Sequence, residues 1–213
     1  MLVTAAAATI GMLLGWGSWV VGRRIAAGQV ETLADAWMRR ALPVVCVALG
    51  GGAMALAASR SGGDAVVLVR VGLLGAPLLI TLATDLLARL VYPLVLLPGW
   101  LLALGLAATG PGGVTGSLVA SAVAGGAAAL LALLAGRLWP DAAETPLGEG
   151  EIFIAAAAGA MLGPERTLPA LFAGMVLGAV VAGLLLATRR REGEDVLPYG
   201  AFLCLATLMA LAL

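Results

Sequence analysis

The chain is organised around the stretch Gly148-Glu149-Gly150-Glu151-Ile152-Phe153-Ile154, which continues as an apolar segment to Leu162-Gly163. In this stretch a carboxylate, Glu151, follows two glycines and directly precedes a hydrophobic segment. A second carboxylate, Asp85, follows another apolar segment, Val66 to Thr84. Most of the remaining sequence is apolar, so the central question is whether these two acids meet in the folded chain.

Composition indicates a helical membrane protein with several spans. Of the 213 residues, 62% are hydrophobic and 11% are charged, and the mean hydropathy is +1.09, values far from those of soluble domains. In lipid every backbone polar group must be paired within its own segment, which helices achieve. The polar-apolar alternation of transmembrane barrel strands is absent. We therefore expect an all-α transmembrane bundle that forms one domain over residues 1–213.

Charge and cysteine content argue against several other classes of function. The formal net charge is zero, which indicates no nucleic-acid partner, and there is no histidine. Cys46 and Cys204 lie inside apolar runs, so neither a His/Cys metal site nor a disulfide framework is expected. No cofactor is expected either. The first apolar segment has no charged leader before it, so we expect no cleavable signal peptide.

About eight apolar segments approach the length of roughly 20 residues that a membrane span requires. We expect them at residues 2–21, 41–58, 65–84, 92–108, 115–135, 152–162, 168–187 and 197–213. The sixth would reach only about 17 Å as a helix, so it should begin inside the protein or at an uneven membrane boundary. Close helix packing is expected at Gly159-x-x-x-Gly163 and Gly174-x-x-x-Gly178, because small residues let helices approach.

The arginines are distributed unequally between the two ends of these segments. With alternating directions, one end holds nine of the 12, namely Arg23, Arg24, Arg39, Arg40, Arg89, Arg137, Arg189, Arg190 and Arg191, and the other holds Arg60, Arg70 and Arg166. The positive-inside rule then predicts that the first end is cytoplasmic. We expect a multi-pass protein of the inner (plasma) membrane, in contact with lipids, with both termini outside the cytoplasm. Asp85 and Glu151 would both lie at the cytoplasmic face.

Two acids at the ends of membrane segments suggest a function, because ionisable groups are costly there. Each has a simpler explanation. Asp85 could pair with Arg89 beside the membrane, and Glu151 could be a first-turn acid that the helix dipole stabilises. However, two carboxylates that share a proton can hold a water, one acting as general base and the other as general acid in peptide hydrolysis. Glycines beside an acid also let a substrate backbone approach closely.

The residues named above resemble those of the type IV prepilin peptidases, which are membrane aspartic proteases of the GxGD kind. The stretch 148–164 is similar to the family's GxGD motif and the small-residue helix after it, which ends in Leu-Gly. Leu197-Pro198-Tyr199-Gly200-Ala201-Phe202-Leu203 resembles the Pro-Phe-Gly-Pro-Phe-Leu start of the final family helix. Gly17-Ser18-Trp19 resembles part of the first helix. Asp85, which is followed by Arg89 and then Pro93, resembles the first of the family's two catalytic aspartates.

This resemblance implies an endopeptidase that removes short basic leaders from prepilin-like substrates at the cytoplasmic membrane face, without a metal. The substrate would be a protein with a hydrophobic N-terminal helix. Asp85 and Glu151 would be the catalytic acids. The residues expected to contact the substrate are Gly148, Gly150, Pro198 and Gly200.

Three features depart from the family pattern. Glu151 stands where the family has aspartate, Phe153 stands where it has lysine, and the segment Arg23 to Arg40 lacks the cysteine-containing insertion of many bacterial members. The missing insertion argues against the family's second activity, N-methylation. The longer side chain can move the carboxylate by more than about 1 Å, and such a misplacement can cost about 100-fold in rate. A slow enzyme, an inactive one and a protease with an adjusted backbone therefore stay open.

Two other functions, neither of them enzymatic, also fit the sequence. One is a protein of the same fold that binds prepilin-like helices or acts as an assembly scaffold, and the departures at Glu151 and Phe153 favour it. The other is a small proton-coupled transporter, which would need its acids near the middle of the membrane.

Overall fold

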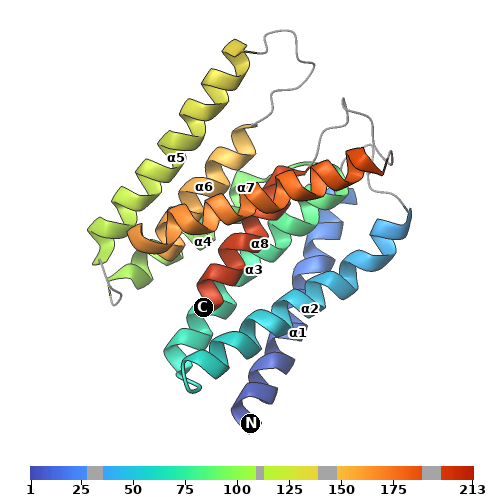
Figure 1. Cartoon of the computed structure of the whole chain (residues 1–213). Coiled ribbons are helices and arrows are strands. Elements are labelled where there is room, and N and C mark those ends of the chain that lie inside the picture. Colours follow the sequence, from blue (N-terminus) through green and yellow to red (C-terminus); the bar gives the residue numbers. More distant parts are fainter. Residues whose placement is uncertain (28–35, 109–112, 139–147, 189–197) are drawn as a thin grey trace.

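The computed structural model describes residues 1–27, 36–108, 113–138, 148–188 and 198–213, and within these ranges it contains helices but no strand (Figure 1). The helices are α1 (Leu2–Ala27), α2 (Ala36–Arg60), α3 (Ala65–Ala88), α4 (Pro93–Ala107), α5 (Gly113–Leu138), α6 (Glu149–Leu162), α7 (Pro164–Ala187) and α8 (Tyr199–Ala212). They confirm the predicted all-α bundle. A turn was expected at residues 109–113; its first four residues and the arginines at 189–191 lie outside the described residues, and Gly113 begins α5.

Five of these helices, α1, α2, α3, α5 and α7, are long and apolar enough to cross a membrane. Each has 24 to 26 residues, more than the roughly 20 that the hydrocarbon core requires. The prediction of a multi-pass membrane protein is therefore supported. Helix α7 begins at Pro164, four residues before the predicted start at 168, because proline is well suited to the first position of a helix.

The other three helices are short. Helix α4 has 15 residues, and α6 and α8 have 14 each, which gives about 21–23 Å at 1.5 Å per residue. A bilayer core of about 30 Å is thicker than any of them. The short sixth segment is thus confirmed, and the last helix is shorter than the predicted segment 197–213. Helix α8 contacts α2, α3, α6 and α7, so it lies inside the bundle.

Contacts between helices define two ends of the bundle. At one end the start of α6 packs against the connection between α3 and α4. Gly150 lies so close to Val91 that a Cβ atom added to the glycine would be only 2.5 Å from Val91 Cβ. At the other end the turn after α2 meets the start of α1, because a Cβ on Gly63 would lie 2.7 Å from Val3 Cγ1. We call these the Asp85 end and the Arg166 end. They fit helices that alternate in direction, as predicted.

Helix α5 runs antiparallel to α6 and continues past its start. A Cβ on Gly159 would meet the backbone of Ala120, and a Cβ on Gly125 would lie 3.1 Å from Ala156 Cβ. This register puts the first turn of α6 level with about residue 129. Helix α5 continues to Leu138, about 13 Å farther at 1.5 Å per residue. Figure 1 shows this overhang at the Asp85 end, where the start of α6 is recessed relative to α5.

The predicted small-residue face on α7 is confirmed. A Cβ on Gly174 would lie 3.0 Å from the Phe202 carbonyl oxygen, and one on Gly178 would lie 3.0 Å from the Tyr199 ring, so both glycines let α7 approach α8. For Gly163 the packing prediction was wrong. This residue has a φ of 74° and nothing within 4 Å of its Cβ position. It turns the chain from α6 into α7, in a conformation that glycine adopts at low cost.

Helices α1 and α2 approach each other through glycines. The Cβ positions of Gly11 and Gly15 fall on the backbone carbonyls of Gly50 and Cys46 in α2. Since lipid supplies no hydrophobic force between helices, this close backbone contact is the main means of holding the pair together. Any side chain at Gly15 must therefore push the two helices apart.

We expect Gly15→Ala to lower the free energy of unfolding by about 1–3 kcal/mol, the usual cost of overpacking. Gly17→Ala is the matched control in the same helix, since nothing lies within 4 Å of its Cβ position. Alanine also favours a helix over glycine by up to about 1 kcal/mol, so the control should be neutral or slightly stabilised. Thermal unfolding in detergent compares the two, and equal midpoints would contradict the packing argument.

Candidate functional site

Asp85 lies in the last turn of α3 and is only 3% exposed. Its Oδ2 accepts a hydrogen bond of 2.7 Å from the backbone N–H of Ala201 in the first turn of α8. The first N–H groups of a helix have no partner within the helix, and the N-cap residue of α8, Pro198, provides no side-chain cap. Asp85 therefore fills this role from another helix, across 116 residues of sequence.

Gly200 makes the contact between Asp85 and α8 possible. A Cβ at this position would lie 3.0 Å from Asp85 Oδ2 and 2.9 Å from Ile154 Cδ1 of α6. The glycine predicted as a substrate contact thus lies directly against the predicted catalytic aspartate. Pro198, the other predicted substrate contact in this segment, immediately precedes α8. Its fixed φ of −72° suits entry into a helix.

Glu151 is the third residue of α6 and is partly buried. Its Oε2 accepts a hydrogen bond of 2.9 Å from the N–H of Gly148, the residue at the N-cap. A glutamate that reaches back from this position is one half of the capping box. The carboxylate thus stabilises the start of its own helix, which is the simpler explanation considered above.

The glycines of this stretch have distinct structural roles. A Cβ on Gly148 would lie 3.1 Å from Glu151 Oε2, so the missing side chain leaves space for the capping carboxylate. Gly150 lets the start of α6 press against Val91. Phe153, where the resembled family has lysine, is 47% exposed and does not share the buried environment of Asp85.

Asp85 and Glu151 lie within electrostatic range of each other. They come together because α8 contacts both α3 and α6, and Cys204 of α8 lies within electrostatic range of both acids. Among the described residues, neither carboxylate hydrogen-bonds to the other, and each instead accepts a backbone N–H. The structure thus brings the two acids to one end of the bundle, with one oxygen of each already engaged.

Two further residues follow Asp85 closely in the sequence; Arg89 was considered above as its partner, whereas Tyr92 was not predicted as part of the site. Arg89 ends α3 with a φ of 52°, donates its N–H to the carbonyl of Asp85, and acts electrostatically on the Asp85 carboxylate. The hydroxyl of Tyr92 is buried and has no hydrogen-bond partner among the described residues. The sequence signal for Tyr92 was only its place before Pro93 at the start of a segment.

Among the described residues, no group of three or more histidine, cysteine, aspartate or glutamate side chains is arranged to hold a metal ion. The chemistry that this end of the bundle supports is carboxylate chemistry. Two acids in mutual range, one deeply buried and one partly buried at the start of a helix, can hold and exchange a proton.

Comparisons with protein families, with curated proteins and with solved structures find no match to this chain.

The hydrogen bond from Ala201 predicts how Asp85 variants differ in stability. Asp85→Asn keeps an oxygen acceptor and removes a buried charge, so we expect it to unfold near the temperature of the parent chain. Asp85→Leu leaves the Ala201 N–H without a partner, at a cost of about 1–3 kcal/mol. Thermal unfolding in detergent measures both. If the leucine variant matches the asparagine variant, Asp85 does not hold the start of α8.

Proposed function

We propose that the chain is a membrane aspartic endopeptidase that cleaves leader peptides of type IV prepilin-like substrates at the cytoplasmic membrane face. The observation that carries the proposal is the meeting of Asp85 and Glu151 at one end of the bundle, within electrostatic range. The resemblance of residues 148–164 and of the start of α8 to the type IV prepilin peptidases supplies the substrate class. The acid pair supplies the mechanism.

In this mechanism Asp85 and Glu151 hold the attacking water between them. One accepts a proton from the water while the other donates a proton to the leaving nitrogen of the peptide bond. Asp85 Oδ2 is held by the N–H of Ala201, which orients the carboxylate. Its Oδ1 accepts no hydrogen bond from the described residues, and we assign this oxygen to the water.

Glu151 has to turn for this reaction. Its Oε2 is held by the N–H of Gly148, and releasing this hydrogen bond costs only about 1 kcal/mol when a substrate or water replaces it. The extra methylene of glutamate gives the carboxylate the reach to swing from the start of its own helix towards Asp85. The substrate must also open the site, because Asp85 is almost fully covered.

If this mechanism holds, Asp85→Asn and Glu151→Gln should each abolish cleavage of a prepilin-like substrate by the purified chain, since an amide can neither accept nor share the proton. Glu149→Gln is the matched control, because Glu149 is exposed in the same helical turn. It should leave turnover within about twofold. Glu151→Asp should preserve or raise activity. Cleavage that survives both amide substitutions would remove the acid pair from the mechanism.

The second candidate is a catalytically inactive relative that binds prepilin-like helices or serves as an assembly scaffold. The capping hydrogen bond between Glu151 and Gly148 favours it, because this bond gives the glutamate a structural role. A parent chain that binds the substrate helix without cutting it, and that gains cleavage with Glu151→Asp, would identify this alternative.

We also propose that the Asp85 end faces the cytoplasm, which agrees with the distribution of arginines and the positive-inside rule. Ser59 and Thr188 are exposed residues near the two ends of the bundle. In intact cells, a membrane-impermeant maleimide should label Ser59→Cys and should reach Thr188→Cys only after permeabilisation. Cys46 and Cys204 are buried and give little background. The reverse pattern would invert the topology and remove the cytoplasmic site.

A further inference from the structure

A cavity of about 360 Å³ lies at the Arg166 end of the bundle, between the end of α2, the start of α3, the turn from α6 to α7 and the end of α8. It is remote from the acid pair. Arg70 and Asp85 stand near opposite ends of α3, 15 residues apart, about 22 Å along the helix. The charged residues that line the cavity are Arg60, Arg70, Arg166 and Glu165.

We propose that this cavity binds a phosphate group, either free or as the headgroup of a phospholipid. Arginine is the side chain best suited to this ligand, because its planar guanidinium donates paired hydrogen bonds to phosphate oxygens. The site stands independently of the peptidase proposal, since it uses different residues at the other end of the bundle.

The guanidinium of Arg70 is only partly hydrogen-bonded among the described residues. It lies inside the membrane-spanning helix α3, where a charged group is costly and indicates a function by default. One of its nitrogens, Nη2, donates to the carbonyl of Met161 at 3.1 Å. Its Nε is buried and has no hydrogen-bond partner among the described residues. The contact with Met161 therefore satisfies only part of the guanidinium.

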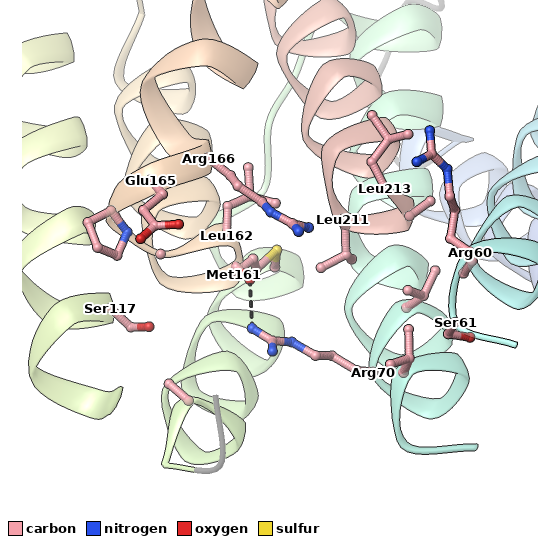
Figure 2. A pocket seen from close by; sticks show the side chains of 17 residues that line it. Arg60, Ser61, Arg70, Ser117, Met161, Leu162, Glu165, Arg166, Leu211 and Leu213 are labelled. Carbon is pink, nitrogen blue, oxygen red and sulfur yellow. Dashed lines mark hydrogen bonds between the residues drawn. The ribbon is translucent and has the colours of Figure 1, made fainter. Parts of the chain in front are cut away.

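Arg166 reaches into the same space from α7. Figure 2 shows the two guanidinium groups entering the same space from opposite sides, that of Arg70 below Met161 and that of Arg166 towards Leu211. Their positive charges act on each other, so an anion between them would replace a repulsion with two attractions. Within the described part of the chain, the hydrogen bond of Arg166 is a long contact of 3.5 Å to the carbonyl of Ala210, which leaves the side chain able to turn towards a ligand.

A second unpartnered donor lines the cavity. The hydroxyl of Ser61, in the turn between α2 and α3, is buried and lacks a hydrogen-bond partner among the described residues. Buried polar groups in folded proteins are nearly always hydrogen-bonded. The Ser61 hydroxyl and the Nε of Arg70 are thus two unpartnered donors, both covered by neighbouring atoms, on residues that line one cavity.

The acids nearby do not neutralise this site. Glu165 is exposed in the first turn of α7, where the helix start stabilises its charge, and in Figure 2 it lies on the side of Ser117 and α5. Within the described ranges no carboxylate forms an ion pair with Arg70 or Arg166. Counting Glu165 and the terminal carboxylate of Leu213 against the three arginines still leaves a positive charge.

Two measurements on the purified full chain distinguish the sources of the phosphate. The first titrates inorganic phosphate in detergent and follows thermal unfolding, with sodium chloride at equal ionic strength as the salt control. The second incorporates the chain into phosphatidylcholine vesicles with or without phosphatidylglycerol, and uses native mass spectrometry to detect lipid retained after extraction. A shift with inorganic phosphate identifies a free ligand, whereas retention of phosphatidylglycerol alone identifies a headgroup.

Arg70→Gln and Arg166→Gln should each weaken the binding that is observed by about tenfold or more, as expected for losing a charged hydrogen bond. Arg137→Gln, at an exposed arginine of the Asp85 end, should bind as the parent does. Arg166 is exposed, so its variant gives a readout even if Arg70→Gln unfolds. The proposal is overturned if neither probe binds, if sodium chloride gives the same shift, or if Arg166→Gln binds normally.

Discussion

The start of α8 depends on a hydrogen bond that another helix supplies. A short helix that begins inside a membrane protein exposes N–H groups where water is scarce, and each unpaired group is costly. Proline precedes α8 and cannot cap it with a side chain. The carboxylate of Asp85 accepts the N–H of Ala201 instead. Because α8 contacts four other helices, this single pairing helps to fix the arrangement of the interior.

Helix α6 meets the same need from within its own sequence. Glu151 accepts the N–H of Gly148, so both acids of the candidate site stabilise the starts of short helices. A structural role and a catalytic one do not exclude each other. A backbone N–H that orients a carboxylate also favours its charged form. The two hydrogen bonds that hold the helices are therefore compatible with the proposed proton transfer, which requires Glu151 to release its own.

Much of the fold follows from the sequence because membrane helices are encoded locally. Apolar runs predicted the number of helices that the described ranges contain, and the short run after Glu151 predicted the short α6. The alternating directions were enough to place Asp85 and Glu151 at one end. The start of α7 at Pro164 was missed because the expected segment 168–187 counted apolar residues and left out Glu165 and Arg166, whereas acids and proline suit a first helical turn.

The partners of side chains could not be predicted in the same way. Nothing local in the sequence connects Asp85 with Ala201, which lies 116 residues away, or Ser61 with Arg166 across a shared cavity. Such pairs depend on how the helices pack. One signal was present for the cavity. Arg70 is a charged residue within an apolar segment, and its position alone was reason to ask what compensates it.

The short α4 also has a consequence for the surrounding bilayer. Its 15 residues include large apolar side chains exposed on its surface, among them Leu94, Leu97 and Leu101. A helix of about 22 Å presents less apolar height than a hydrocarbon core of about 30 Å. The mismatch is relieved by local thinning of the lipid or by the flanking long helices. The lipid beside α4 therefore meets a shorter apolar surface than the lipid beside the 24- and 26-residue helices α7 and α5.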